Sequence, residues 1–448
     1  MKKILNNLHK DLYIEVFLAL FIILSFCFTS PINVFKGYWT ILSSPSILLT
    51  DYVFIAGMGP TFLNVAIMLL ANLILIKVLD IKMSGPVYAS LMIVVGFSFF
   101  GKNILNTLPI YFGIWLFSRL RKIPYKSLII TILLSTGLGP LVSYMIFGFG
   151  LEYYISIPLG ILCGIVAGFG VPAFAAHTLS FHEGYNLYNT GFALGIIAAI
   201  FNGIFIAFNL KSQTLGYLTG FDDINHITFY LVLYGLAIFC LIIAFTKIKV
   251  VLKEYKALLK TSGRLISNYL RDFKEETVLF NFAILDIVVT TIFAIFGIPM
   301  NGIIFGSIIS ILGCSAFGLH IRNAISVWIG CTVAIICKLA SEGNFVISFK
   351  DGLDIVFNLE VKDNLSAMVA FIFATGIAPI CGKYGIIYGL VGGFIHILFT
   401  PLVLPLQGGY DLYNNGFSAG FEASILAVCA EKIFYRERHH HARKSKDM

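Results

Sequence analysis

Two copies of one short polar motif are the residues whose types and spacing could bind a solute. The motif reads GYNLYNTGF at 184–192 and GYDLYNNGF at 409–417, and each copy precedes an apolar segment. Asn is a good helix N-cap, and a helix N-terminus offers free N–H groups and partial positive charge. The pattern predicts two helix starts that line a polar constriction; the alternative is a pair of interfacial loops, where Tyr is also favoured. The candidate path residues are Tyr185, Asn186, Tyr188, Asn189, Tyr410, Asp411, Tyr413 and Asn414.

Two carboxylates lie inside apolar segments. Asp286 is central in FAILDIVVTT, and Glu422 lies about two helical turns into the segment that follows the second motif. Carboxylates are costly in lipid and often mark ion pathways, so both are candidates for ion coupling. We hypothesise that Glu422 loads a proton or another cation, and that Asp286 pairs with it or serves a sodium ion. The alternative is a protonated or hydrogen-bonded packing role for each.

Small residues interrupt two apolar segments, at Ser98 and at Ser315. Such breaks let backbone groups line a cavity, or simply let helices pack closely. The one group of chelating side chains is His177, His182 and Glu183. No further chelating residue has a suitable spacing nearby, so the sequence predicts no metal site and no cofactor.

The composition indicates which elements must position these residues. Hydrophobic residues make up 58% of the 448-residue chain and charged residues only 12%. A soluble domain needs roughly a quarter of its residues charged, so most of this surface must face lipid. The apolar stretches run for about 18–25 residues, which is typical of spanning helices rather than barrel strands. They lie near 12–30, 53–79, 84–101, 103–118, 126–148, 155–176, 190–210, 227–247, 278–298, 301–317, 321–339, 366–381, 384–404 and 416–431.

Charge patterning orients these segments. With the N-terminus inside and sides alternating, the inner side receives most of the 31 Lys and Arg residues. This asymmetry follows the positive-inside rule and predicts a multi-pass protein of a bacterial inner membrane with both termini cytoplasmic. The exceptions on the outer side are Lys36, Lys102, Lys211, Lys338, Lys350 and Lys362.

The chain contains an internal duplication. Residues 83–113 align without a gap to 300–330, and residues 160–195 align to 385–420. The alignment matches Gly, Asn, Ser and Tyr as well as apolar residues, which chance similarity between apolar segments does not explain. An odd number of spans separates the equivalent segments, so the repeats are inverted, an arrangement that commonly places a solute site at the repeat interface.

The fold expected is therefore an all-α polytopic membrane protein with two inverted-topology repeats. The pairs 84–101 with 103–118 and 301–317 with 321–339 are short for a hydrocarbon core of about 30 Å. Two arrangements stay open: ten spans plus two re-entrant hairpins, or fourteen spans. The expected divisions are a first repeat at 1–246, a cytoplasmic amphipathic linker at 247–277, a second repeat core at 278–431 and a basic cytoplasmic tail at 432–448.

The linker combines apolar positions at helical spacing with eight basic residues over 247–277. This pattern predicts an amphipathic helix on the inner leaflet, with membrane lipid as its partner. The tail with His439, His440 and His441 is expected to be solvated near anionic lipid. Topology explains the formal net charge of +8, so no nucleic-acid partner is expected; homo-oligomers are compatible with the sequence.

The duplicated layout and the GYNLYN-type motif resemble a bacterial membrane-protein family of unknown function that carries its domain twice. The chain also resembles urea transporters more weakly. Tyr188-Asn189 with Leu194-Gly195, and Tyr413-Asn414 with Gly420, fit that family's Gly-Tyr-Asn-x-x-Leu-x-Gly signature loosely. That resemblance implies inverted repeats of five spans plus a re-entrant helix.

The sequence favours a permease or channel for a small polar or weakly charged solute, and no enzymatic activity. The alternative is a membrane-embedded enzyme acting on a lipid-linked substrate. Such an enzyme would need acid, base or nucleophilic side chains converging near one face, and only 177–183 offers a cluster of this kind.

Overall fold

The computed structural model describes residues 2–210, 223–265, 267–348, 354–357 and 361–444. The first half contains α1 (Lys2–Ser25), α2 (Pro31–Leu42), α3 (Tyr52–Ala56), α4 (Met58–Val78), α5 (Gly85–Phe97), α6 (Ile104–Arg121), the 3₁₀ helix η1 (Tyr125–Leu128), α7 (Ile129–Ser135), the 3₁₀ helix η2 (Thr136–Leu138), α8 (Gly139–Phe147), α9 (Tyr153–Phe181) and α10 (Asn189–Ala207).

The second half repeats the order of the α-helices and contains in addition a two-stranded hairpin. It contains α11 (Asp223–Phe245), α12 (Ile248–Leu258), α13 (Tyr269–Asp272), α14 (Glu275–Ile295), α15 (Gly302–Gly313), the 3₁₀ helix η3 (Cys314–Ala316), α16 (Ile321–Ser341), β1 (Phe345–Ser348), β2 (Asp354–Phe357), α17 (Val361–Phe373), the 3₁₀ helix η4 (Ala374–Ile377), α18 (Ala378–Tyr384), α19 (Ile386–Gln407) and α20 (Asn414–Lys444).

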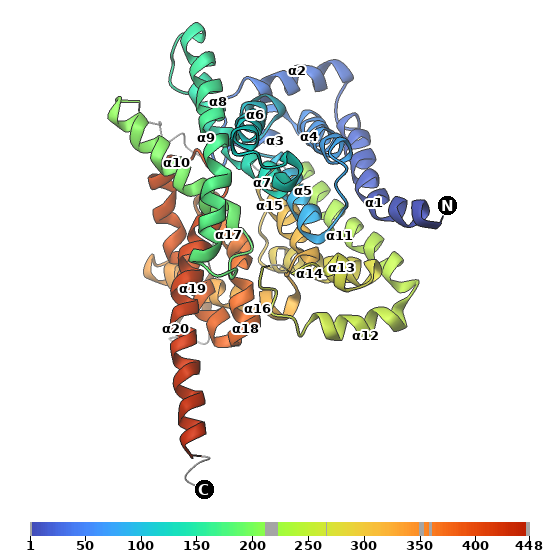
Figure 1. Ribbon diagram of the computed structural model, residues 1–448, viewed down its shortest axis with the longest axis vertical. Helices are drawn as coiled ribbons and strands as arrows, with labels where there is room; N and C mark the ends of the chain where they lie inside the picture. The colour runs from blue at the N-terminus through green and yellow to red at the C-terminus, as the bar shows by residue number, and fades with distance from the viewer. Residues whose placement is uncertain (1, 211–222, 266, 349–353, 358–360, 445–448) are drawn as a thin grey trace.

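Two short equivalent helices, α5 and α15, pack against each other in the middle of the molecule (Figure 1). They run antiparallel, because Gly85 lies against the carbonyl of Ala316 while Gly96 lies against Gly306. A Cβ on Gly96 would meet the Gly306 carbonyl oxygen at 2.1 Å. Glycine at this crossing lets the backbones touch, as small residues do between membrane helices.

At the C-terminal end of each short helix, backbone carbonyls accept hydrogen bonds from a buried Asn of the preceding long helix. Asn64 Nδ2 donates to the carbonyls of Ser98 and Lys102, at 2.7 and 2.9 Å. Asn281, the equivalent residue, donates in the same way to Ser315 and Leu319, at 2.9 and 2.8 Å. The carbonyls at a helix C-terminus lack helical partners, and in lipid they must be satisfied within the protein. These bonds let the chain break inside the apolar region.

The surface elements establish the inversion. Helices α2 and α12 are equivalent, and Figure 1 shows them at opposite ends of the molecule. Asp51, just before α3, accepts the N–H of Gly302 at the start of α15. Asn268, just before α13, accepts the N–H of Gly85 at the start of α5. Each repeat therefore caps the short helix of the other repeat, from opposite faces. We name these the α2 face and the α12 face.

The predicted segments 126–148 and 366–381 are helices broken in the middle. The breaks are η2 and η4, which coincide with the sequences TGL and ATGI. A 3₁₀ turn leaves backbone carbonyls outside the α-helical ladder, and discontinuous helices of this kind supply binding groups in inverted-repeat transporters. In this protein, their carbonyls contact the polar motifs described below.

Apart from the hairpin β1–β2, the described chain is helical, and it is a polytopic α-helical membrane protein with inverted repeats, as predicted. Among the described residues, nine helices are long and apolar enough to cross a membrane. Fourteen full spans is wrong, because α5 has 13 residues and measures about 20 Å. Its partner α6 has 18 residues and α16 has 21, so each pair combines a short helix with a longer returning helix, closer to a re-entrant hairpin.

The segment 247–277 differs from its prediction. Helix α12 ends at Leu258, and α13 covers only Tyr269–Asp272. The helix cannot continue, because Gly263 adopts φ +74° and lies against the carbonyl of Gly318. Since α12 and α13 are equivalent to α2 and α3, this segment belongs structurally to the second repeat.

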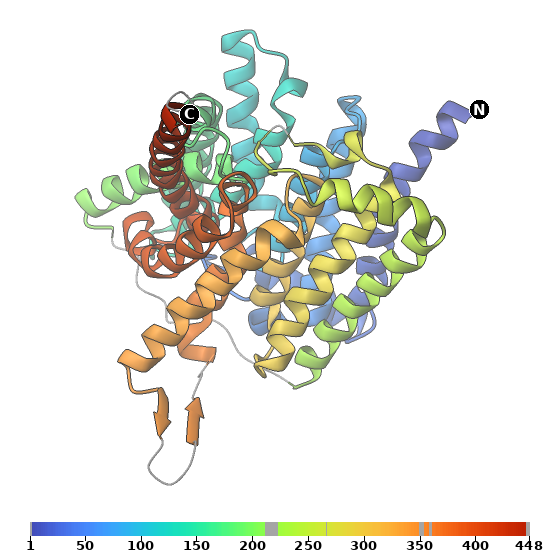
Figure 2. The same cartoon turned by 90° about the horizontal axis from the view of Figure 1, so that it is seen from below.

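Two features were not predicted from the sequence: the β-hairpin after α16 and the length of α20. Figure 2 shows α11 and α14 side by side and the hairpin β1–β2 projecting from the end of α16. Helix α20 continues past position 431 to Lys444, through the segment expected to be a tail (Figure 1).

Candidate functional site

The two polar motifs meet at the crossing of α10 and α20. As predicted, these helices begin at Asn189 and Asn414. A Cβ on Gly191 would lie 3.3 Å from the Cα of Gly416, and one on Gly416 would lie 3.1 Å from the Cα of Gly191. Because these glycines are equivalent, the pseudo-two-fold axis passes between them, and the first turns of both helices lie next to it.

Each motif docks on the broken helix of the opposite repeat. Leu187 N–H donates to the Gly376 carbonyl at 2.9 Å, and Leu412 N–H donates to the Gly137 carbonyl at 3.0 Å. The motif tyrosines cover the same glycines: a Cβ on Gly137 would meet the Tyr413 ring at 2.1 Å. The 3₁₀ breaks therefore position the motifs, and the interface between the repeats is made of backbone polar groups.

Asn186 and Asp411 occupy equivalent positions, and each accepts the N–H two residues further on, at 2.9 Å. The remaining atoms differ. Asn186 Nδ2 donates to the Gly416 carbonyl at 2.9 Å. Asp411 Oδ2 is buried without a hydrogen-bond partner. A buried unpaired carboxylate oxygen is costly, so this atom marks a place where a donor is needed.

Lys102 supplies the opposite charge in the same region. Its side chain is fully buried, and Nζ has no hydrogen-bond partner. Nζ lies over the rings of Phe97 and Tyr413, at 5.5 and 5.7 Å from their centroids. Asp411 lies near enough to act on Lys102 electrostatically, but the two form no ion pair within 4 Å. A basic and an acidic side chain thus lie in one buried region, and the polar atoms Lys102 Nζ and Asp411 Oδ2 both lack hydrogen-bond partners.

The two motif tyrosines differ in their hydroxyls. Tyr188 Oη lies 3.0 Å from Thr375 Oγ1, so it is paired. Tyr413 Oη is buried without a partner, although Thr136 is the residue equivalent to Thr375. Instead, the Tyr413 ring packs against Phe97 in a tilted arrangement, with 4.7 Å between the ring centroids, and faces Lys102 Nζ. Lys102 Nζ, Asp411 Oδ2 and Tyr413 Oη form what we call the central site.

The other predicted path residues are distributed around this site. Asn189 turns away from it, toward α9, where it bonds Thr178, the Ala175 carbonyl and His182. The Asn414 carboxamide accepts the N–H of its neighbour Asn415. The Asn189 carboxamide is therefore held by polar partners on and after α9 rather than directed at the central site, and its role on the solute path stays a prediction.

Tyr185 and Tyr410 lie at the two ends of the motif region rather than in the centre. Tyr185 bonds Tyr384 and lies under the guanidinium of Arg264, at 4.4 Å. Tyr410 packs on Tyr144 and Phe205. Both side chains are buried, so both belong to the walls of the interface.

Ser98 and Ser315 lie at the ends of α5 and η3. Ser98 Oγ bonds back to the Val94 carbonyl, whereas Ser315 Oγ is buried and unpaired. Nearby, Cys314 lies within interaction range of the Tyr188 hydroxyl. The helix breaks therefore lie beside the motifs, and the role of Ser98 and Ser315 on the solute path stays a prediction.

Glu422 is paired with a residue that the sequence analysis did not single out. Its Oε2 lies 2.8 Å from His396 Nδ1, and His396 Nε2 lies 3.2 Å from Asn415 Oδ1. All three side chains are buried, and Glu422 Oε1 is unpaired. Asp286 instead bonds Thr290 at 2.9 Å on its own helix. The expected pairing of Asp286 with Glu422 is wrong, because His396 occupies that role.

Two residues of the candidate site were thus not singled out from the sequence. Lys102 was placed in an outer loop, yet it lies between two short apolar segments, where a lone cation among apolar residues is a signal of burial. His396 stands in the middle of the apolar segment 384–404, and an ionisable residue there carries the same meaning as Glu422. An ionisable residue inside an apolar segment thus indicates a candidate buried site, whether it is Lys, His, Asp or Glu.

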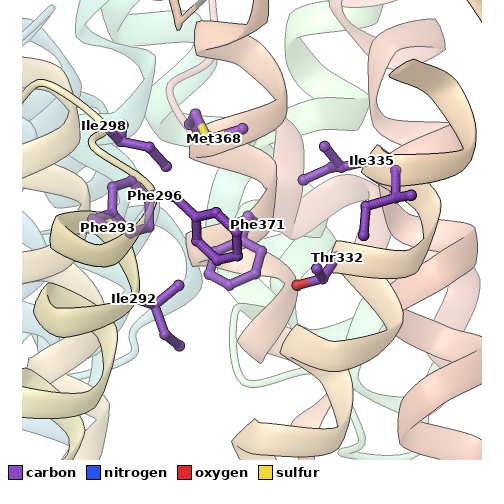
Figure 3. A pocket seen from close by; sticks show the side chains of 9 residues that line it. Ile292, Phe293, Phe296, Ile298, Thr332, Ile335, Met368 and Phe371 are labelled. Carbon is purple, nitrogen blue, oxygen red and sulfur yellow. The ribbon is translucent and has the colours of Figure 1, made fainter. Parts of the chain in front are cut away.

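The structure also contains two hollows away from the central site. Figure 3 shows an apolar one of about 50 Å³, where Phe293, Phe296 and Phe371 gather and Thr332 supplies the oxygen. A larger hollow of about 600 Å³ lies on the α2 face beside Asp51, Asn225 and Asn301. Among the described residues, no group of three His, Cys, Asp or Glu side chains could hold a metal ion.

The family model for a protein of unknown function, DUF1576, matches the chain twice, over residues 30–207 and 247–432. The chain therefore belongs to this duplicated family. The second match begins at 247, in agreement with the equivalence of α12 to α2. Neither the curated proteins nor the solved structures contain a match to the chain.

Proposed function

We propose that this member of the family is a permease or channel for a small polar or weakly charged solute, which binds at the crossing of the two repeats. The observation that carries the proposal is the central site. Lys102 Nζ, Asp411 Oδ2 and Tyr413 Oη are buried together without partners. Ionisable groups at membrane depth are expensive and are retained where a substrate or ion needs them.

The surrounding fold supports the same proposal. Inverted repeats with discontinuous helices commonly hold a solute near the midplane and expose it alternately to either face. Here η2 and η4 contact the motifs directly, so a rearrangement of either broken helix would change the central site. The site is closed to solvent, with Lys102 and Asp411 both fully buried, as expected of an occluded intermediate.

The orientation proposed from the charge pattern places the α12 face and both termini in the cytoplasm of a bacterial cell. No observation favours the membrane-embedded enzyme. His182, the central residue of the only candidate cluster, bonds Asn189 and packs on Phe192, a structural role. We propose transport without chemical conversion of the solute.

Coupling to a cation gradient is a second part of the proposal. The Glu422 carboxylate and the His396 imidazole can share a proton, and Asn415 links this pair to the first turn of α20. Since α20 begins at the motif that holds Asp411 and Tyr413, protonation of the pair would change packing next to the central site. A sodium ion would instead require several oxygen ligands. Glu422 contacts an imidazole nitrogen of His396, which favours a proton over sodium as the coupled cation.

Purified protein in liposomes tests the transport proposal. Stopped-flow light scattering would follow the entry of glycerol, acetamide, glycine, sodium acetate and methylammonium chloride. At least one solute should enter wild-type proteoliposomes faster than empty liposomes, and Lys102→Met should slow the entry of that solute at equal incorporation. If all five enter at the rate of empty liposomes, the transport proposal is rejected.

The coupling proposal uses the solute that enters fastest. Under an imposed proton gradient, wild type should concentrate that solute, whereas Glu422→Gln should exchange it without concentrating it. His396→Gln should behave like Glu422→Gln. Wild-type flux that only runs downhill under proton and sodium gradients would replace the coupled carrier with a channel.

A further inference from the structure

Each charged residue of the central site has a neutral counterpart in the opposite repeat. The residue equivalent to Lys102 is Leu319, whose carbonyl receives the same bond from Asn281 that Lys102 receives from Asn64. The residue equivalent to Asp411 is Asn186, which forms the same turn. The pseudo-two-fold axis therefore relates Lys102 and Asp411 to a neutral pair on the same backbone. This comparison separates what the fold requires from what the ligand requires.

The backbone at these positions does not need the charges. Leu319 and Asn186 adopt the equivalent places and are both fully buried. Removing a charged pair from a protein interior is often neutral or stabilising when the replacements pack well. Burial of the Lys102–Asp411 pair thus lowers the stability of the fold, a cost that the neutral pair Leu319–Asn186 avoids.

The net charge of the site restricts the ligand. Lys102 and Asp411 sum to zero, whether as a charged pair or as a neutral pair after proton transfer. An added anion or cation would leave one uncompensated charge in a region of low dielectric constant, which is costly. A net-neutral ligand with an acceptor at one end and a donor at the other leaves none.

The unpaired atoms match such a ligand. Lys102 Nζ and Tyr413 Oη offer donors, and Asp411 Oδ2 offers an acceptor. We propose, on the basis of the proposed transport function, that the central site binds a small net-neutral dipolar solute. Its carboxylate or carbonyl end contacts Lys102 and Tyr413, and its ammonium or amide N–H end contacts Asp411.

Four probes of similar size test this proposal: glycine as a zwitterion, acetamide as a neutral amide, acetate as an anion and methylammonium as a cation. Wild-type entry rates should favour glycine or acetamide over both ions by roughly tenfold or more, since tenfold corresponds to about 1.4 kcal/mol. Lys102→Leu leaves Asp411 alone and should shift the preference to methylammonium. Asp411→Asn leaves Lys102 alone and should shift it to acetate.

The double variant Lys102→Leu with Asp411→Asn converts the charged pair into a copy of its neutral counterpart, Leu319 and Asn186. It should fold with at least wild-type thermal stability and lose the preference for glycine and acetamide. Leu319→Met, at the equivalent neutral position, is the matched control and should keep wild-type selectivity.

The outcomes separate this inference from the transport function on which it rests. Entry of acetate or methylammonium in preference to both neutral probes keeps transport and overturns the inference. Unchanged selectivity in the double variant also overturns it, and would make Lys102 and Asp411 a structural pair. Entry of none of the four probes, with glycerol still entering, rejects the dipolar class.

Discussion

At the scale of single residues, the two motif tyrosines occupy equivalent positions but differ in the hydrogen bonding of their hydroxyls. Tyr188 Oη bonds Thr375 and closes one half of the interface. Tyr413 Oη has no partner and faces Lys102. The same side chain thus stabilises the fold in one repeat and remains available for a ligand in the other.

Replacement of each tyrosine by Phe should separate these duties. Tyr188→Phe should lower stability by about 1 kcal/mol, the usual net worth of a hydrogen bond, because Thr375 loses its partner. Tyr413→Phe should leave stability within about 0.5 kcal/mol and reduce solute entry. Thermal unfolding in detergent and liposome entry rates measure the two effects. Equal loss of entry in both variants would contradict the asymmetry.

His320 illustrates a second asymmetry between equivalent residues. It caps α16 as Asn103 caps α6. Its Nδ1 accepts the N–H of Asn323, and its Nε2 faces the Thr261 carbonyl on the α12 face at 3.0 Å. Burial lowers the pKa of His320 to about 4, and the nearby positive charge of Arg322 contributes to the same shift.

Acid should therefore destabilise the protein through His320. The folded pKa lies below the ordinary value near 6.5, so this stability is present above that value and falls as pH drops toward 4. Between pH 7 and pH 5 the loss should be about 2 kcal/mol. His320→Asn, which installs the residue of the first repeat, should remove most of this loss. Thermal unfolding at both pH values measures it; identical acid sensitivity in the variant would exclude His320 as its source.

At the scale of elements, the short antiparallel pair α5–α15 holds the repeats together. The contact depends on glycines at the crossing, and on the side chains of Asp51 and Asn268 that cap each helix from the opposite repeat. The swapped caps mean that neither repeat is complete without the other.

Gly96→Ala should destabilise the protein by about 2 kcal/mol or more, because its Cβ would lie 2.1 Å from a backbone oxygen. Gly203→Ala on α10 is the control, since a Cβ there meets nothing within 4 Å. The control should unfold at or slightly above the wild-type temperature, consistent with the better helix propensity of Ala. Similar unfolding temperatures for the two variants would place the critical crossing elsewhere.

At the scale of the whole molecule, the inverted repeats give a matched test of orientation. Lys36 on α2 and Lys253 on α12 are equivalent, and both are exposed. With native cysteines replaced, Lys36→Cys should react with an impermeant thiol reagent in intact cells. Lys253→Cys should react only after permeabilisation. Labelling of Lys253→Cys alone in intact cells would reverse the orientation; Lys211, which is also expected on the outer side, lies outside the described residues.

The sequence by itself determined the features that repeat. Matched Gly, Asn and Tyr residues indicated the duplication, apolar length indicated helices, and the charge bias indicated that the repeats are inverted. The helix starts at Asn189 and Asn414 were predicted from the motif, although the N-cap of α10 is Tyr188, whose side chain forms no capping bond. These inferences depend on contacts between residues near in sequence, or on a comparison of the chain with itself.

Only the tertiary structure decided which polar groups meet. Whether Asn189 faces α9 or the central site depends on a partner carried by another helix, and no periodicity encodes that choice. The same holds for the Glu422–His396 pair and for the convergence of Lys102, Asp411 and Tyr413. A buried charge is apparent in the sequence as an anomaly, but its partner is fixed by the packing of distant helices. That is why the sequence indicated a site between the repeats, and only the fold identified the charged pair Lys102 and Asp411 within it.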